Sequence, residues 1–283
     1  MIIMFPENGL CNRMMAVASG YALAKELSQE YRVIWNRDRF LGATFNDLFC
    51  PIADIPVTEL CWEHSLADKL RYPYFWFTRH PLAGKLPEWI RSMIFDRVLK
   101  SPELHAMLMA GRSIADELRA TRKSLLFSYE NFHSGGVSSL RCFQPVPNLK
   151  DIVDREAQRF GPNVIGVHIR KPDHDTVIWK NSLEEFEACM SREVESEESA
   201  TFFLATDSAE SEKHIRNRFG SRVMAREKSR NRENVAGMRD AVIDLYLLSR
   251  TRKVLGSSGS TFSTAAAALG GIPLVSEGRT GCP

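Results

Sequence analysis

The chain has 283 residues, 44% of them hydrophobic, so it can bury a large core and is long enough for one large domain or two ordinary ones. Its 37 basic and 35 acidic residues leave a formal charge of +2, and no global field favours a nucleic-acid partner. The six cysteines lack CxxC spacing, which argues against a zinc site and a compact disulfide framework. No signal-like segment or long apolar run occurs, so we expect a soluble, cytoplasmic protein.

The first 36 residues predict a strand, a helix and a second strand. Residues 1–5 are apolar, Pro6 and Gly9 mark a turn, and apolar residues then recur at helical spacing, before the strand-like YRVIWN. This β-α-β unit favours a parallel sheet. The turn before the helix has two interpretations. It is an ordinary connection, or it uses the positive helix N-terminus to face phosphates or a sugar, with Asn12 or Arg13 as the contact.

The sequence predicts two domains, 1–146 and 147–283. Residues 61–126 have a helical, aromatic-rich pattern, and QPVPNLK then breaks the periodicity with two prolines. Beyond the break, strand patterns at 163–170, 201–207, 222–226, 253–258 and IPLVS alternate with helical ones. Capping signals mark helix starts at Ser182, with Glu185, and at Ser208 and Ser260. We therefore expect an α/β fold of two Rossmann-like domains facing a cleft at the carboxyl ends of their strands.

Polar residues follow three strands of the second half. In VHIRKPD, His168 and Arg170 share one face of a strand, and the guanidinium fork suits a phosphate. The alternative is a core histidine beside a surface ion pair. Asp207, after the next strand, can orient a ribose hydroxyl, a sugar hydroxyl or an arginine, or can act only as part of a helix cap.

The turn GSSGSTFS joins a strand to a helix and has two interpretations. Its hydroxyls and amides, including those of Ser258, Ser260 and Thr261, can surround an anion, or the turn is a serine-rich cap. The patterns GxGxxG, GxxxxGK[ST], GxSxG and HExxH do not occur, so the sequence gives no support to a dinucleotide enzyme, a P-loop enzyme, a serine hydrolase or a zincin.

The segments NGLCNRMM, GVHIRKPD, FFLATDS and AVIDLYLLSRTRKVLGSSGSTFS resemble the GDP-fucose-dependent fucosyltransferases, notably the bacterial nodulation and animal core α1,6 enzymes, with kinship to the α1,2 and protein O-fucosyltransferase groups. The resemblance covers most of the second half and a short N-terminal stretch. It implies a GT-B-like fold and GDP-fucose as the donor. Lys171 stands where the family has a second arginine, and Pro172 where it has a small hydroxyl residue.

The resemblance also implies roles for single residues. His168 and Asp244 would contact guanine and Arg170 the diphosphate. Ser260, Thr261 and Phe262 would cradle the diphosphate, with Lys171 in support. Transfer would invert the sugar configuration, with Arg170 as the catalytic cation in place of a metal ion. The general base stays open among Glu130, His133 and Asp173. The alternatives to a fucosyltransferase are a non-catalytic GDP-sugar-binding module and a GT-B transferase for another nucleotide sugar.

The aromatic stretch from Tyr72 to Phe95 has two interpretations. Its rings pack in the core of a helical insert. Alternatively, rings such as Trp76 and cations such as Arg79 form an exposed face for a glycan, glycolipid or lipid-linked acceptor, which would place the protein at the inner face of a membrane.

Overall fold

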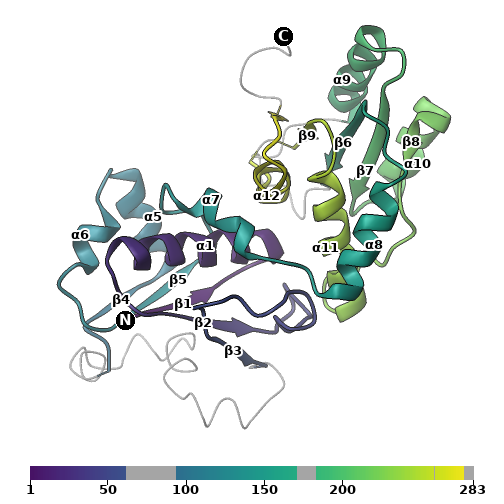
Figure 1. The fold of residues 1–283 in the computed structure, drawn as a ribbon. Coiled ribbons are helices and arrows are strands. Elements are labelled where there is room, and N and C mark those ends of the chain that lie inside the picture. Colours follow the sequence, from purple (N-terminus) through teal and green to yellow (C-terminus); the bar gives the residue numbers. More distant parts are fainter. Residues whose placement is uncertain (62–93, 171–182, 258, 277–283) are drawn as a thin grey trace. The chain divides into compact units, whose positions relative to one another are not determined.

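The computed structural model describes residues 1–61, 94–170, 183–257 and 259–276, which form two compact units. The first comprises Met1–Val146 and Arg232–Met238, and the second Pro147–Asn231 and Arg239–Pro283. Each unit has its own parallel sheet with helices packed against it (Figure 1). The predicted α/β class with two Rossmann-like domains is confirmed.

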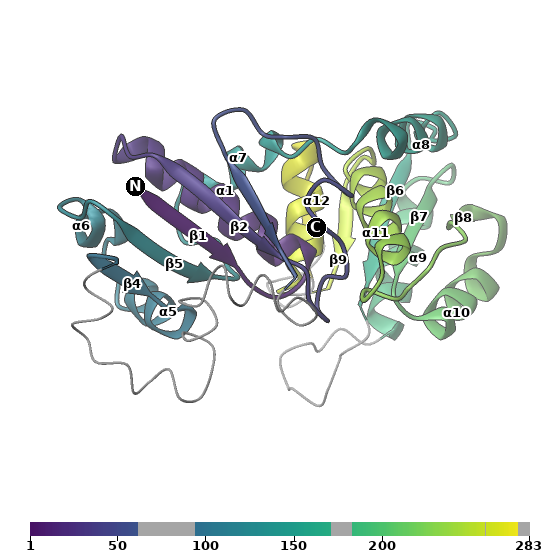
Figure 2. The ribbon, with the colours of Figure 1, turned by 90° about the horizontal axis from the view of Figure 1, so that it is seen from below.

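The sheet of the first unit has the order β3-β2-β1-β5-β4 within the described residues. Its strands are β1 (Ile2–Pro6), β2 (Tyr31–Asn36), β3 (Val57–Leu60), β4 (Arg97–Leu99) and β5 (Ser124–Ser128), and all neighbours are parallel. Its helices are α1 (Leu10–Glu26), α5 (Ser101–Met109), α6 (Ile114–Leu118) and α7 (Gly136–Ser139). Figures 1 and 2 show α1 along the sheet.

The helical interpretation of 61–126 is wrong for β4 and β5. Strand β5 lies between β1 and β4 and is buried at every position, so the sequence SLLFS has no alternation of polar and apolar residues to mark it. Strand β4 has only 3 residues, too few to show a period. Phe95, just before β4, is buried in a core cluster with Phe5 and Phe127, which supports the core interpretation for this residue. The other residues of the aromatic stretch, up to 93, lie outside the described residues.

The sheet of the second unit has the order β10-β9-β6-β7-β8 in the described part of the chain. Its strands are β6 (Val164–Ile169), β7 (Thr201–Thr206), β8 (Val223–Met224), β9 (Val254–Gly256) and β10 (Leu274–Ser276). Its helices are α8 (Pro147–Ala157), α9 (Leu183–Ser196), α10 (Ala209–Phe219), α11 (Val235–Leu248) and α12 (Thr261–Gly270). Because β6 is the first strand of this sheet, the order reverses between β6 and β9, as it does in mononucleotide-binding sheets.

Two helices of this unit begin at the predicted caps. The Ser208 hydroxyl accepts a hydrogen bond from the Ser211 amide at 3.1 Å, and that of Ser260 one from the Ser263 amide at 3.4 Å. At the far end of α12, Gly271 adopts φ +63°, a left-handed conformation that favours glycine. Helix α12 packs against β9 and β10, which holds its N-terminus near the carboxyl end of β9.

The segment Arg232–Met238 belongs to the first unit although the predicted boundary at 146 placed it in the second domain. The Gly42 amide donates a hydrogen bond to the Arg232 carbonyl at 2.8 Å, and a Cβ at Gly42 would overlap the backbone of Glu233. The division between the units therefore falls within α11. None of the described helices has the length and apolarity needed to cross a membrane.

Candidate functional site

The carboxyl ends of β6 and β9 form the candidate site of the second unit. Parallel pairing sets His168 beside Gly256 and Ile169 beside Thr206 of β7. The residues that follow the strands, Arg170 and Ser257, therefore emerge at one edge of the sheet. This is the place where the strand order reverses and where open α/β sheets bind ligands.

His168 is the buried centre of this edge, with 7% of its surface exposed. Its Nδ1 lies 2.8 Å from the Ser263 hydroxyl and 3.4 Å from that of Ser260. The imidazole stacks on Phe262, with the ring centroids 4.6 Å apart and the planes 22° apart. Two elements, β6 and α12, thus fix the ring, and Nε2 has no hydrogen-bond partner among the described residues.

His168 is uncharged at neutral pH. Burial lowers its pKa to about 3, and the positive charges of Arg170 and Lys228 add to this effect. A neutral imidazole whose Nδ1 is engaged by hydroxyls can hydrogen-bond a ligand through Nε2 but supplies no charge. It suits contact with a polar, uncharged group such as a nucleobase.

Arg170 supplies the positive charge that His168 lacks. It follows β6 directly and is half-buried. Its amide donates to the Ser257 hydroxyl at 3.4 Å, and that hydroxyl lies 3.5 Å from the His168 carbonyl oxygen. A single serine thereby ties the ends of β6 and β9 together. Lys171 and Ser258, two further predicted contacts, lie outside the described residues.

The N-terminus of α12 opens at the same edge. Ser260 is buried and caps the helix, while Thr261 and Phe262 are half-buried in its first turn. The first amides of a helix have no partner within it and carry partial positive charge. Together with Arg170, they make an environment suited to phosphate oxygens.

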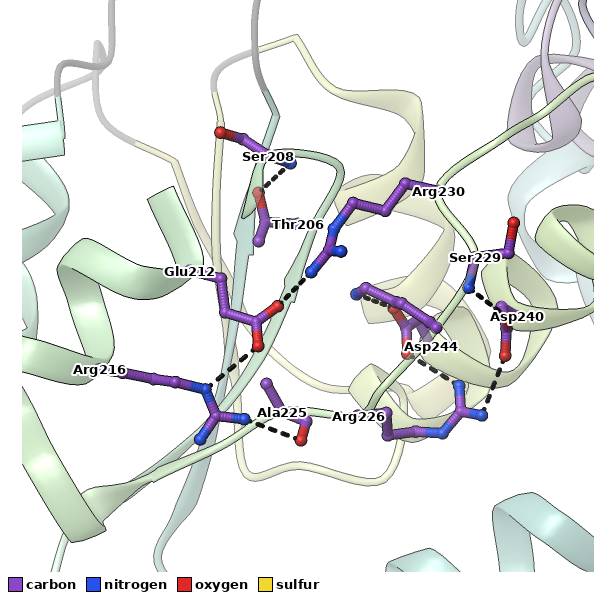
Figure 3. A network of polar contacts seen from close by, with 11 residues as sticks. Thr206, Ser208, Glu212, Arg216, Ala225, Arg226, Ser229, Arg230, Asp240 and Asp244 are labelled. Atoms are coloured by element: carbon purple, nitrogen blue, oxygen red, sulfur yellow. Dashed lines mark hydrogen bonds and ion pairs between the residues drawn. The ribbon is translucent and has the colours of Figure 1, made fainter. Parts of the chain in front are cut away.

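Asp244 lies on α11 and is buried, with 4% of its surface exposed. Figure 3 shows Arg226, from the segment after β8, reaching its carboxylate. Arg226 Nη1 donates to Oδ1 at 3.3 Å, and the Lys228 ammonium donates to Oδ2. Burial raises the pKa of Asp244, whereas Lys228 and Arg226 favour its charged form.

Arg226, Lys228 and Asp240 were not predicted as site residues. Arg226 also donates to Asp240 at 3.0 Å, and Asp240 accepts from the Ser229 amide at 2.8 Å. In the sequence these cations belong to the charged run AREKSRNRE, a composition typical of a solvated loop. No local signal separates Lys228, whose side chain is buried, from its exposed neighbours Glu227 and Arg230.

Asp207 lies at the carboxyl end of β7, one strand beyond β6, and is exposed. Its neighbours Thr206 and Ser208 are buried, and the Ser208 amide donates to the Thr206 hydroxyl at 3.1 Å. The cap of α10 is Ser208 itself, so a ligand contact by Asp207 stays a prediction.

In the first unit, the two predicted contacts of the turn at Gly9–Arg13 have different surroundings. Asn12 is half-buried, and its Nδ2 donates to the Tyr129 carbonyl at 2.8 Å, next to the end of β5. The strand order of this sheet changes direction between β1 and β5, so Asn12 lies at the equivalent edge.

Arg13 has a structural role instead of the predicted ligand contact. Its side chain is fully buried, and Nη2 donates to both carboxylate oxygens of Asp38 at 2.8 and 2.9 Å. Nε donates to the Asn8 carbonyl at 2.7 Å, and the guanidinium lies over the Trp35 ring at 5.5 Å. The prediction is wrong for this residue because a guanidinium surrounded in this way ties α1 to the segment after β2 and has no exposed surface for a donor.

Two of the three candidate bases are paired in the first unit. Glu130 Oε2 lies 3.1 Å from Nδ1 of the exposed His105, and His133 Nε2 lies 2.9 Å from Glu26. Glu130 lies two residues after the end of β5, next to Tyr129. His133 contacts Glu26, the last residue of α1. Asp173 lies outside the described residues.

The described residues contain no group of three His, Cys, Asp or Glu side chains able to hold a metal ion. Asp173 and Asp175 have the Asp-x-Asp spacing of a metal-binding carboxylate pair, but both lie outside that part of the chain.

No family model matches the chain, and no curated protein sequence matches it significantly. Solved structures do. The fucosyltransferase NodZ from Bradyrhizobium is 19% identical, with a TM-score of 0.64 over 98% of this chain and 96% of that one. A FUT1 variant from Arabidopsis thaliana, solved with GDP, is 16% identical, with a TM-score of 0.63 over 96% of this chain and 69% of that one.

POFUT1 in complex with GDP-fucose is 12% identical, with a TM-score of 0.56 over 98% of this chain and 97% of that one. Identities this low carry information about the fold, and they do so over almost the whole chain. The chain therefore has the two-domain fold of the NodZ, FUT1 and POFUT1 fucosyltransferases.

Proposed function

We propose that the protein is an inverting glycosyltransferase that moves fucose from GDP-fucose to a hydroxyl of a glycan or glycoconjugate. One observation carries the proposal: neutral His168, cationic Arg170 and the N-terminus of α12 converge where the strand order of the second unit reverses. The fold supports it, because NodZ and POFUT1 have been solved with GDP-fucose.

The reaction is a single displacement. The acceptor oxygen attacks C1 of fucose, the bond from C1 to the diphosphate oxygen breaks, and GDP leaves with the bonding electrons. Negative charge grows on the diphosphate, so fixed cations and amides facing it lower the barrier. Arg170 is the main cation, with Lys171 and the first amides of α12 in support. The acceptor proton passes to a base, for which Glu130, His133 and Asp173 are the candidates.

The donor test is thermal unfolding with GDP, GDP-fucose, UDP and ADP at equal concentrations. GDP and GDP-fucose should raise the melting temperature more than UDP, because the Asp244 carboxylate can accept from two adjacent N–H groups of guanine and uracil offers only one. Equal stabilisation by UDP would reject GDP as the donor nucleotide and favour a transferase for another nucleotide sugar.

Release of fucose from GDP-fucose separates an enzyme from a binding module. A transferase hydrolyses its donor slowly when no acceptor is present, whereas a module that only senses GDP-sugars binds without turnover. We propose a reaction without a metal ion. EDTA should therefore leave hydrolysis unchanged, and loss of activity that Mn²⁺ restores would instead show a metal requirement, for which Asp173→Asn and Asp175→Asn would be the variants to test.

The acceptor side of the proposal includes a glycan, a glycolipid or a lipid-linked glycan, reached from the cytoplasm at the inner face of a membrane. Sedimentation with anionic liposomes tests the membrane contact. Binding that weakens with salt, and drops when Trp76→Ala is combined with Arg79→Ala, supports it. Protein that stays in the supernatant at low salt points to a soluble glycan.

A further inference from the structure

The side chains of Lys228 and Asp244 form a buried ion pair, although Lys228 lies in a charged segment whose composition is typical of a solvated loop. Only 5% of the Lys228 side chain and 6% of the Asp244 side chain are exposed, although Lys228 comes from the irregular segment between β8 and α11. A buried ion pair is weak evidence of a stabilising role, since removing two charges from water costs as much as their attraction returns. The pair is better explained by the ligand chemistry that it can serve.

The pair lies within electrostatic reach of the edge described for β6 and β9. The Lys228 charge acts on His168, and both groups belong to the second unit. His168 in turn stacks on Phe262 and has no partner at Nε2 in the described part of the chain. A planar ligand bound at this edge would thus meet His168 and the Lys228–Asp244 pair together.

The Lys228–Asp244 pair keeps hydrogen-bonding groups that its own contacts do not use. Each carboxylate oxygen has two acceptor sites. Arg226 occupies one site on Oδ1 (Figure 3). Lys228 occupies one on Oδ2. One acceptor site remains on each oxygen, and the Lys228 ammonium has three N–H groups in all, one of which faces Oδ2. The network presents two adjacent acceptors beside a donor.

Guanine is the common base that complements this pattern. Its edge carries two adjacent donors, N1–H and N2–H, beside the O6 acceptor. Adenine has one donor beside an acceptor, and uracil has a single N–H between two carbonyls. When N1–H donates to Oδ2 of Asp244, O6 falls on the side where Lys228 lies.

We propose that Lys228 donates a hydrogen bond to O6 of guanine and so determines the base specificity of the donor site together with Asp244. The inference rests on the proposed function, since it assumes that a purine nucleoside diphosphate binds here. It assigns Lys228 a ligand contact rather than a purely structural ion pair.

The test measures dissociation constants for GDP, inosine diphosphate and ADP with wild type and Lys228→Met. Inosine diphosphate keeps O6 and N1–H but lacks the N2 amine. Losing a charge-assisted hydrogen bond should weaken GDP and inosine diphosphate by about tenfold or more each. The ratio of the dissociation constants of GDP and inosine diphosphate should stay constant, and the affinity for ADP should stay unchanged.

Lys253→Met is the matched control. Lys253 forms an ion pair with Glu193 at 2.6 Å in the same unit and directly precedes β9, so it lies at the amino end of that strand and not at the carboxyl end that forms the candidate site. This variant should leave all three affinities unchanged. If Lys228→Met does not fold, Lys228→Gln replaces it, and its amide should retain part of the discrimination of GDP over ADP.

The outcomes separate the two proposals. If wild type binds GDP no better than ADP and UDP, the proposed donor fails. If wild type prefers GDP but Lys228→Met weakens GDP and ADP equally, or weakens neither, the specificity role of Lys228 is overturned and the proposed function stands.

Discussion

Arg170 is the residue whose replacement most directly probes transfer. Arg170→Ala should lower kcat about a hundredfold, because a charge-assisted contact that strengthens in the transition state contributes on the order of 3 kcal/mol. Arg170→Lys should recover only part of the rate, since it restores the charge without the fork. Steady-state kinetics with GDP-fucose, alongside a circular dichroism spectrum to verify folding, provide the measurement. A folded Arg170→Ala variant with wild-type turnover would assign the catalytic cation elsewhere.

His168 makes the stability depend on pH in a predictable direction. Its native pKa is about 3 because the ring is buried, whereas an unfolded histidine titrates near 6.5. The unfolded state therefore binds more protons between these values, and the free energy of unfolding falls as pH falls below 6.5. One pH unit below that value, the loss is about 1.4 kcal/mol.

The check is denaturant unfolding of wild type and His168→Asn at pH 7.5 and pH 5.5. The variant should lose less stability than wild type between the two pH values, whatever its baseline at pH 7.5. Equal losses would mean that the native ring takes up a proton in this range.

At the scale of elements, Asp38 fixes α1 to the segment after β2 through Arg13. Asp38→Ala should destabilise the protein by about 3–5 kcal/mol, because it leaves a buried guanidinium without its carboxylate. Combining Arg13→Met with Asp38→Leu should cost less than Asp38→Ala alone, since no unpaired charge remains. Chemical denaturation of the three variants measures this, and a double variant worse than the single one would contradict the explanation.

Gly256 sets how closely α12 approaches β9. A Cβ at this position would overlap the Ser263 side chain, whose hydroxyl also contacts His168. Gly256→Ala should therefore cost about 1–3 kcal/mol and weaken GDP binding through displacement of the α12 N-terminus. Gly161→Ala, at a position with open space around it, is the control and should change neither property. Unchanged GDP affinity in a destabilised Gly256→Ala variant would remove α12 from the donor site.

At the scale of the whole molecule, each unit has its own sheet and core, so ligand binding should stabilise them unequally. GDP at a hundred times its dissociation constant should stabilise the second unit by about 2.7 kcal/mol. Hydrogen exchange followed by mass spectrometry should show added protection in β6, β9 and α12 that exceeds any in β1 and β2. Protection confined to the first unit would place the nucleotide there.

The sequence alone determined the elements whose signals are local. Short, largely apolar strands such as β2 and β7, the caps at Ser208 and Ser260, and the polar residues after β6 are all set by neighbours along the chain. They were sufficient for the α/β class, for two Rossmann-like halves and for His168 and Arg170 as partners at one strand end.

Only the tertiary structure decided what depends on partners distant in sequence. Strand β5 is recognised by its neighbours β1 and β4, since burial on both faces removes the alternation. Arg13 became structural because Asp38, 25 residues later, meets its guanidinium. Lys228 is a candidate site residue because α11 places Asp244 where the two side chains form an ion pair. A charged side chain has the same local pattern whether it faces water, a carboxylate or a ligand, so its role is decided by the fold that surrounds it.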